Sequence, residues 1–224
     1  MSIRDIRESD NLAQAFLKNE KAAAQRYACE HPDSLLSRFI EELHSLGFVF
    51  ETSNQALGLM PKYKAMVLPI ALSYYQLAKE EKQINEQNYF LGFFHFKGLT
   101  EVVPMLLNDF NAGETADSTR WFLADCLYQI RSKEYIDRYI EIASNYAFGI
   151  NRQMIVLLLG KLKAEKAIPL LISLLEDKEV CLQAISALGE FKRVEFRCYF
   201  ERFRDSPHPG WRKYARVALK KLDN

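Results

Sequence analysis

The feature that most constrains the fold of this chain is a repeat in the placement of its apolar residues. Along most of the sequence these residues fall at i, i+3, i+4 and i+7, which predicts a series of amphipathic helices. The helices alternate in two kinds, and each pair consists of a first and a second helix. One apolar position near the end of the second helix recurs at intervals of 33, 32, 29 and 31 residues. It is occupied by Phe94, Leu127, Leu159, Leu188 and Leu219. Such a period predicts helix pairs that stack, because one short pair cannot bury its own apolar faces.

Positions next to this marker follow the same period. The residues one and four places earlier are apolar or small in all five helices. They are Phe93, Cys126, Leu158, Ala187 and Ala218, and Phe90, Leu123, Ile155, Ala184 and Ala215. Three of the first helices contain a proline between apolar residues, in "VLPIAL", "VVPMLL" and "AIPLLI". These prolines are Pro69, Pro104 and Pro169. Because proline in a helix interior costs about 3 kcal/mol, we expect these prolines in first turns or at kinks.

These features resemble a known repeat family. Proline in the first helix, an Asp and an Arg around the second, and Gly or Lys after a leucine look like short bacterial HEAT repeats of the phycobilisome-lyase type. The clearest instance is "LEDKEVCLQAISALGEF" at residues 175–191. The resemblance covers residues 61–224 and implies an all-α fold, a right-handed α-solenoid of about five HEAT-like helix pairs in one continuous domain.

Residues 1–60 do not follow the register. Two amphipathic helices are predicted there, at residues 10–31 and 33–47. The second has Asp33 or Ser34 as its N-cap and Gly47 as its stop. We expect these helices to form an N-terminal cap over the open end of the solenoid, which would otherwise expose an apolar face.

The chain departs from the family pattern in its charged pairs. The family pairs an Asp in the turn with an Arg in the second helix, and Asp117 with Arg120 keeps this pair. Asp177 instead stands opposite Cys181, and Arg152 follows "YAFGIN" without an Asp. Arginine still recurs at one register position, in Arg120, Arg152 and Arg212. We expect this row to form a ladder whose guanidinium groups bridge turns and helix ends.

Composition limits the class of protein. With 224 residues, of which 49% are hydrophobic and 26% charged, the chain can bury one sizeable core. No apolar run reaches the roughly 18 residues of a membrane span, and the polar start lacks the apolar stretch of a signal peptide, so we predict a cytoplasmic protein. The four cysteines and four histidines show no metal-ligand spacing, so neither a metal nor a cofactor is expected.

The second helices supply the candidate binding surface. At about 100° per residue, Trp121, Asp125 and Tyr128 point away from the core stripe of their helix, toward an expected concave face. A Trp beside a Tyr there would anchor a protein partner, whereas the alternative is that Trp121 packs sideways and is mostly buried. The predicted partner-binding residues are Trp121, Asp125, Tyr128, Gln153, Asn88 and His95. The same rows continue through Gly92, Leu157, Gly160, Leu182, Ser186, Gly189, Lys213, Val217 and Lys220. The small residues among them would let the backbone of a partner approach closely.

We therefore predict a non-catalytic HEAT-repeat scaffold that binds another protein through its concave face. The alternative is nucleic-acid binding at the C-terminal end. Residues 192–221 carry ten Lys and Arg against three Asp and Glu, interleaved with aromatic residues. The net charge of +1 divides into −5 for residues 1–149 and +6 for residues 150–224. The candidate nucleic-acid contacts are Arg152, Arg212, Lys213, Arg216 and Lys220. The periodic spacing of the aromatic residues favours a place for them in the core instead.

An enzymatic function is a third hypothesis. Trp121, Asp125 and Arg152 look similar to the aromatic residue, aspartate and arginine on the concave face of HEAT-like alkylpurine DNA glycosylases. The resemblance implies that Asp125 stabilises a cationic sugar, Trp121 packs on the damaged nucleotide and Arg152 holds a phosphate. The chain lacks the paired tryptophans of that family, so no catalytic residue is assigned.

Overall fold

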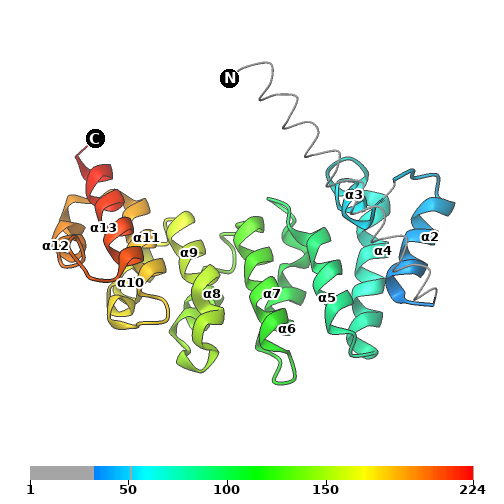
Figure 1. The fold of residues 1–224 in the computed structure, drawn as a ribbon, viewed down its shortest axis with the longest axis horizontal. Helices are drawn as coiled ribbons and strands as arrows, with labels where there is room; N and C mark the ends of the chain where they lie inside the picture. The colour runs from blue at the N-terminus through cyan, green and yellow to red at the C-terminus, as the bar shows by residue number, and fades with distance from the viewer. Residues whose placement is uncertain (1–32, 51, 224) are drawn as a thin grey trace, which may run out of the picture. The chain divides into compact units, whose positions relative to one another are not determined.

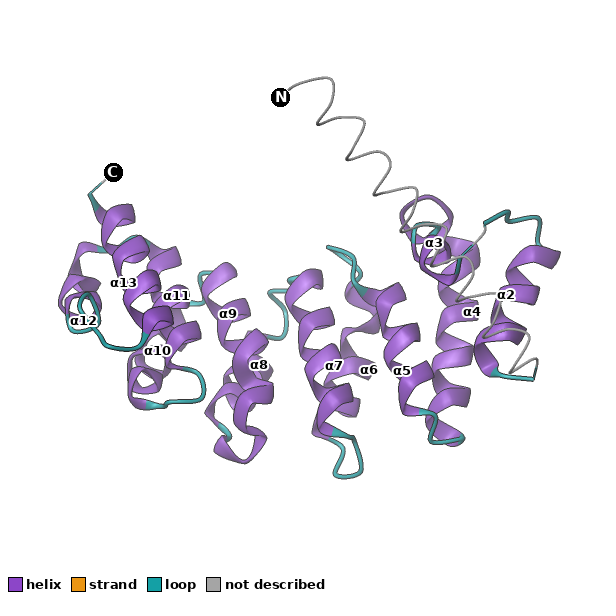
Figure 2. Cartoon of the chain, viewed as in Figure 1, coloured by secondary structure: helices purple, strands orange, loops and turns teal. Residues whose placement is uncertain are grey.

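The computed structural model describes residues 33–50 and 52–223, which consist of helices and turns without a strand (Figure 2). The all-α fold predicted from the sequence is therefore confirmed. Two compact units are present, one holding the described residues up to Phe93 and the other running from Phe94 to Asp223. The division between a cap of residues 1–60 and a solenoid of residues 61–224 falls inside the first unit and stays a prediction.

The first unit begins with the second of the two helices predicted before residue 61. This helix, α2 (Leu35–Ser45), is capped by Ser34, whose side chain accepts a hydrogen bond from the backbone N–H of Ser37. Gly47 follows the helix at φ 88°, in the left-handed conformation that glycine adopts readily, so both predicted ends are confirmed, with Ser34 as the N-cap. The helix predicted at residues 10–31 lies outside the described residues.

An aromatic cluster forms the core of the first unit. The unit also contains α3 (Ser53–Leu57), α4 (Met60–Glu80) and α5 (Ile84–Leu91). The ring of Phe39 on α2 meets the rings of Tyr74, Phe90 and Phe93 edge-on, at centroid distances of 5.3, 5.2 and 5.0 Å. Edge-to-face contacts at this distance are favourable, so one phenylalanine joins α2 to α4 and α5.

The second unit is a stack of helix pairs (Figure 1). Its α-helices are α6 (Val103–Asn111), α7 (Asp117–Ile130), α8 (Ile136–Ser144), α9 (Gln153–Lys161), α10 (Ile168–Ser173), α11 (Cys181–Phe191), α12 (Arg197–Glu201) and α13 (Pro209–Leu222). In each pair the first helix packs on the second, and the second helices pack on one another in the order α7, α9, α11, α13. This arrangement is an α-solenoid, as the period predicted.

The apolar register is the core of the structure. All fifteen residues of the three rows defined by the marker are at most 9% exposed. Pro104 and Pro169 lie in the first turns of α6 and α10, as expected. Pro69 lies inside α4, whose backbone leaves the helical region at Tyr63, six residues earlier, with φ −121° and ψ 30°.

The helix ends repeat as well. A left-handed residue follows the marker by four positions in four successive repeats, at Gly98, Arg131, Lys163 and Lys192, with φ of 84°, 60°, 50° and 54°. The chain then enters the next first helix through a short 3-10 turn in three of these cases, residues Thr100–Val102, Glu165–Ala167 and Val194–Phe196. One turn geometry is thus reused along the stack.

Two glycines of the predicted partner-facing rows have a different role. Gly160 and Gly189 are both buried. A Cβ on Gly160 would stand 2.7 Å from the Cβ of Ala187, closer than real carbon atoms approach, and one on Gly189 would stand 3.1 Å from the Cβ of Ala218. The expectation that they admit the backbone of a partner is wrong, because these glycines admit the neighbouring second helix instead.

Candidate functional site

The side of α7, α9, α11 and α13 that faces away from their core residues is named here the second-helix face. On α7 it carries Trp121, Asp125 and Tyr128, which are spaced four and three residues apart. Trp121 is 41% exposed, and its ring meets the ring of Phe122 edge-on at 5.4 Å. More than half of the Trp121 surface is covered, but the remainder leaves an apolar area open on this face.

His95 lies against Asp125 of this face. The His95 Nε2 is 3.6 Å from the Asp125 carboxylate, beyond hydrogen-bonding distance, and is buried without a hydrogen-bond partner among the described residues. Burial lowers the pKa of His95, although the Asp125 charge acts to raise it, so the imidazole is neutral at neutral pH. Burial also raises the pKa of the Cys126 thiol, so that this cysteine does not supply a thiolate nucleophile here.

A groove crosses the second-helix face between four helices. It has a volume of about 280 Å³ and is named here the inter-helix groove. Its lining comprises Tyr128 of α7, Leu157 and Lys161 of α9, Leu182, Gln183, Ser186, Ala187 and Glu190 of α11, and Tyr214 of α13. The register placed Tyr128, Leu157, Leu182 and Ser186 on this surface. It missed Tyr214, because on α13 it selected the neighbouring Lys213, and it missed the two charged residues at the helix ends.

Two other predicted residues lie apart from the groove. The side-chain amide of Gln153 donates to the backbone carbonyl of Glu179 at 2.8 Å, so it holds the turn before α11. Asn88 lies on α5 in the first unit, with its Oδ1 buried and without a hydrogen-bond partner among the described residues. Neither residue lines the groove.

The arginine row forms the expected ladder. Each of the three guanidinium groups donates to backbone carbonyls in the segment between the first and second helices. Arg120 bonds the carbonyls of Phe110 and Ala112, Arg152 those of Ala143 and Gly149, and Arg212 those of Ser206 and Pro207. Phe110 and Ala143 lie in the last turn of α6 and α8, where the helix supplies no N–H to their carbonyls, so the row provides donors at these helix ends.

Arg152 also joins two repeats. Its Nη2 donates to Asp177 at 2.7 Å and to Glu179 at 3.2 Å, and its side chain is 0% exposed. The turn before Arg152 contains no Asp. Its carboxylate partner is instead Asp177, which lies in the turn of the next repeat. A buried, fully bonded guanidinium does not reach a phosphate, so the predicted nucleic-acid and glycosylase roles of Arg152 are wrong.

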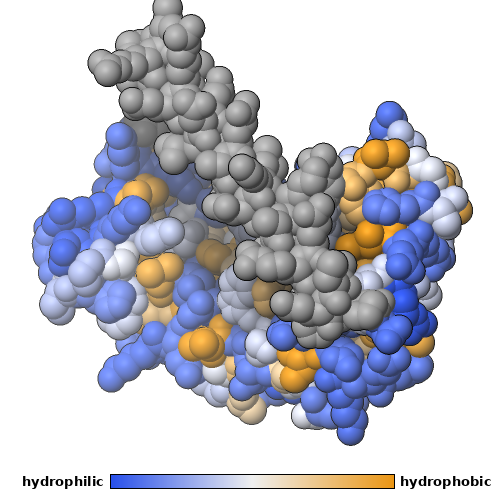
Figure 3. Space-filling model, turned by 45° about the vertical axis from the view of Figure 1, so that its right-hand side comes forward, coloured by the Kyte–Doolittle hydropathy of each residue, from blue (hydrophilic) through white to orange (hydrophobic). Residues whose placement is uncertain are grey.

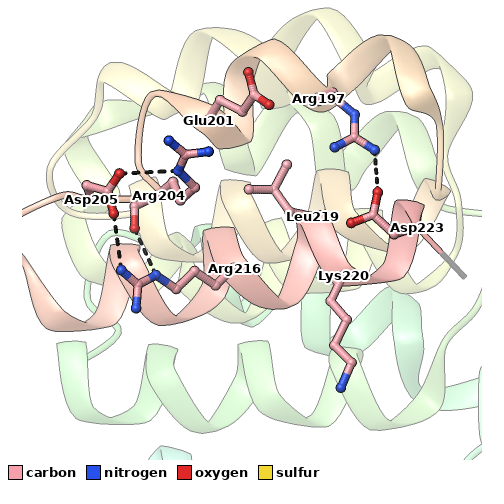
Figure 4. A pocket seen from close by; sticks show the side chains of 8 residues that line it. All are labelled: Arg197, Glu201, Arg204, Asp205, Arg216, Leu219, Lys220 and Asp223. Atoms are coloured by element: carbon pink, nitrogen blue, oxygen red, sulfur yellow. Dashed lines mark hydrogen bonds and ion pairs between the residues drawn. The ribbon is translucent and has the colours of Figure 1, made fainter.

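The basic C-terminal segment is largely paired with carboxylates. Figure 4 shows Arg197 turned toward Asp223, and Arg204 and Arg216 converging on Asp205, around a hollow of about 480 Å³ between α12 and α13. The distances are 2.6 Å for Arg197 to Asp223, 3.2 Å for Arg204 to Asp205 and 3.1 Å for Arg216 to Asp205. Lys213 and Lys220 are exposed, so of the predicted nucleic-acid contacts these two are the most accessible.

Exposed ion pairs also link successive repeats. Each pair joins a carboxylate to a base that lies one repeat later. The pairs are Asp137 with Lys166 at 3.1 Å, Glu165 with Arg193 at 2.6 Å and Glu176 with Arg202 at 2.6 Å. Of these three, only the Asp137–Lys166 pair joins the acidic residues 1–149 to the basic residues 150–224, because Glu165 and Glu176 belong to the basic part themselves.

Other classes of site were sought over the same residues. On the face drawn in Figure 3, apolar residues form separate patches among hydrophilic ones, as on most protein surfaces. In residues 33–50 and 52–223, no group of three or more Cys, His, Asp or Glu side chains has an arrangement that suits a metal ion. No helix of the described part has the length and apolar character needed to cross a membrane.

Comparison with protein families identifies one segment. Residues 152–177 match the PBS lyase HEAT-like repeat. The matched segment holds α9 and α10, the second helix of one pair and the first helix of the next. Its first and last residues, Arg152 and Asp177, are the two partners of the buried ion pair. No curated protein matches the chain.

Proposed function

Because the chain carries a HEAT-like repeat within a stack of helix pairs, we propose that it is a non-catalytic scaffold that binds a protein partner on its second-helix face. The observation that supports this most is the groove formed by four successive second helices, next to an exposed tryptophan. Stacked repeats produce extended surfaces of this kind, because equivalent side chains line up from one repeat to the next.

Trp121 is the proposed anchor. Tryptophan and tyrosine contribute most to many protein interfaces, because they bury a large area with few rotatable bonds. Trp121 is exposed, Tyr128 lies two turns further along the same face, and Tyr128 also lines the groove. An anchor and a groove on one face are what a partner segment needs to bind in a fixed register.

Affinity purification with the full chain as bait, with and without nuclease, tests this function. Trp121→Ala should lose the partner that the wild type retains, and Val194→Ala is the matched control. Val194 is 69% exposed but lies in the 3-10 turn that leads into the first helix α12, and it does not line the inter-helix groove. Retention of every partner by Trp121→Ala would contradict the proposed site.

The nuclease arm separates the nucleic-acid alternative. Seven of the ten basic residues between 192 and 221 have a carboxylate or a backbone carbonyl as a partner, so fewer phosphate contacts are available than the sequence suggested. We expect partners to survive nuclease treatment. Loss of all partners on nuclease treatment would favour nucleic-acid binding through exposed groups such as Lys213 and Lys220.

A further inference from the structure

The inter-helix groove also indicates the chemistry of its occupant. Resting on the proposed function, we infer that the groove binds an extended acidic segment of the partner protein. One apolar side chain of the segment enters between the tyrosines and leucines, and its carboxylates lie along the C-terminal ends of the second helices. Three properties of the groove lead to this assignment, namely its size, its polar groups and its charge.

The size of the groove favours a side chain over a cofactor. Pockets that hold drug-sized ligands have volumes of roughly 300–1,000 Å³. At about 280 Å³ the groove lies just below that range. Its apolar lining comes from Leu157, Leu182 and Ala187, with Tyr128 and Tyr214 on the outer helices. Such a site accepts one large apolar side chain.

The polar lining suits a peptide backbone. In the described part of the chain, the Gln183 amide and the Ser186 hydroxyl have no hydrogen-bond partner, although both line the groove. An extended segment presents one N–H and one C=O per residue, and these need partners when the segment is buried. Amide and hydroxyl groups that both donate and accept can supply them.

The charge at one end of the groove favours an acidic segment. Glu190 accepts from Lys161 at 3.3 Å and from Lys221 at 2.8 Å, so two lysines share one carboxylate. The guanidinium of Arg131 lies 5.7 Å from the ring centroid of Tyr128. The two lysines outnumber the carboxylate that they share, and Arg131 adds a cation beside Tyr128, whereas Lys166 and Asp137, which do not line the groove, form a one-to-one pair.

The same charges give the segment a direction. Asp125 lies one turn before Tyr128 on α7, beside His95, and places a carboxylate on this part of the face. Acidic residues of the segment are repelled there and attracted at the lysine end. The apolar anchor therefore lies between the acidic residues and the part of the segment that reaches Trp121.

Selection of a library of random linear peptides on the full chain tests this inference without knowledge of the natural partner. Enriched peptides should carry a Leu, Phe or Trp with Asp or Glu on one side. For a synthetic copy of an enriched peptide, Leu157→Asp and the double variant Lys161→Gln with Lys221→Gln should each weaken binding by at least about tenfold. Lys166→Gln and Val194→Ala, which remove a charge or an apolar side chain elsewhere, should leave it unchanged.

Several results would overturn the inference. They are no enriched peptide, enrichment of basic peptides, binding that Leu157→Asp does not affect, and displacement of the peptide by a single-stranded oligonucleotide through the same lysines. If Leu157→Asp does not fold, Ser186→Tyr fills the groove without adding charge and should give the same loss. A natural partner that depends on Trp121 but not on Leu157 would overturn the groove inference and leave the proposed function standing.

Discussion

Arg152 is the residue on which the stack depends most. Its guanidinium donates to the carbonyls of Ala143 and Gly149, which lie in its own repeat, and to the carboxylates of Asp177 and Glu179 in the next one. The arginine side chain has five N–H groups in one plane, so it can donate to these carbonyls and carboxylates at once. Lysine does not have this geometry. Arg152 therefore links the two repeats directly, beside the packing of α9 on α11 and the hydrogen bond from Gln153 to Glu179.

Arg152→Ala is expected to lower the free energy of unfolding by about 3–5 kcal/mol, because it leaves the buried carbonyl of Ala143 and the Oδ2 of Asp177 without their charged partner. The measurement is urea unfolding followed by circular dichroism. Arg138→Ala is the control, since Arg138 forms only an exposed ion pair with Glu141 and should change stability by less than about 1 kcal/mol. Equal effects of the two substitutions would contradict the role assigned to Arg152.

Glu190 gives the stack a pH dependence that can be measured. Burial acts to raise the pKa of Glu190, but Lys221 and Lys161 together lower it below the ordinary value of 4.5. A lowered pKa in the folded state means that the stabilisation is complete above pH 4.5 and is lost as the pH falls through the folded pKa. Glu190→Gln should therefore destabilise the protein at pH 7, by no more than about 1 kcal/mol because the site is partly exposed, and by less at pH 4. If Glu190→Gln lowered the free energy of unfolding more at pH 4 than at pH 7, the lysines would not stabilise the carboxylate.

The helices α9 and α11 approach each other closely at Gly160. The glycine permits this approach, because any side chain at this position would overlap the backbone and Cβ of Ala187. The sequence showed a glycine at the end of a leucine run, a place where glycine commonly ends a helix. The structure shows that Gly160 is still helical and that its missing side chain is what matters.

Gly160→Ala is expected to destabilise the chain by about 1–3 kcal/mol, although alanine favours helix over glycine by about 1 kcal/mol, because the two helices must move apart. Thermal unfolding of the variant measures the effect. Gly113→Ala is the matched control, since Gly113 lies in an exposed turn and a Cβ there would contact nothing within 4 Å. A stabilised Gly160→Ala variant would mean that helix propensity outweighs the close contact.

At the scale of the whole molecule, the apolar period predicted the helix pairs, their order and the three buried rows. The period succeeded because each repeat buries residues at equivalent positions against its neighbour, so the apolar pattern recurs in every repeat. The left-handed residues Gly98, Arg131, Lys163 and Lys192 keep the same spacing as the marker, and the last three stand at or one residue beyond the C-caps of α7, α9 and α11. Only the first of them is a glycine, so composition alone did not reveal this row.

The contacts between repeats were not predictable in the same way. Asp177 bonds to an arginine 25 residues earlier, and Tyr214 rather than Lys213 reaches the groove. Both depend on how far one helix pair is rotated relative to the next, which the spacing of apolar residues does not specify. The lining of the inter-helix groove was therefore predicted in part, since Tyr128, Leu157, Leu182 and Ser186 lie on the predicted rows, whereas Lys161, Glu190 and Tyr214 do not.

Hydrogen–deuterium exchange of the full chain, with and without a purified partner, tests the central claim most directly. If the second-helix face binds the partner, protection should increase in segments 121–130, 153–161, 182–190 and 211–221, which belong to α7, α9, α11 and α13. Segments of the first helices, such as 136–144 and 168–173, should exchange as before. Protection confined to the first helices, with the second helices unchanged, would contradict the account.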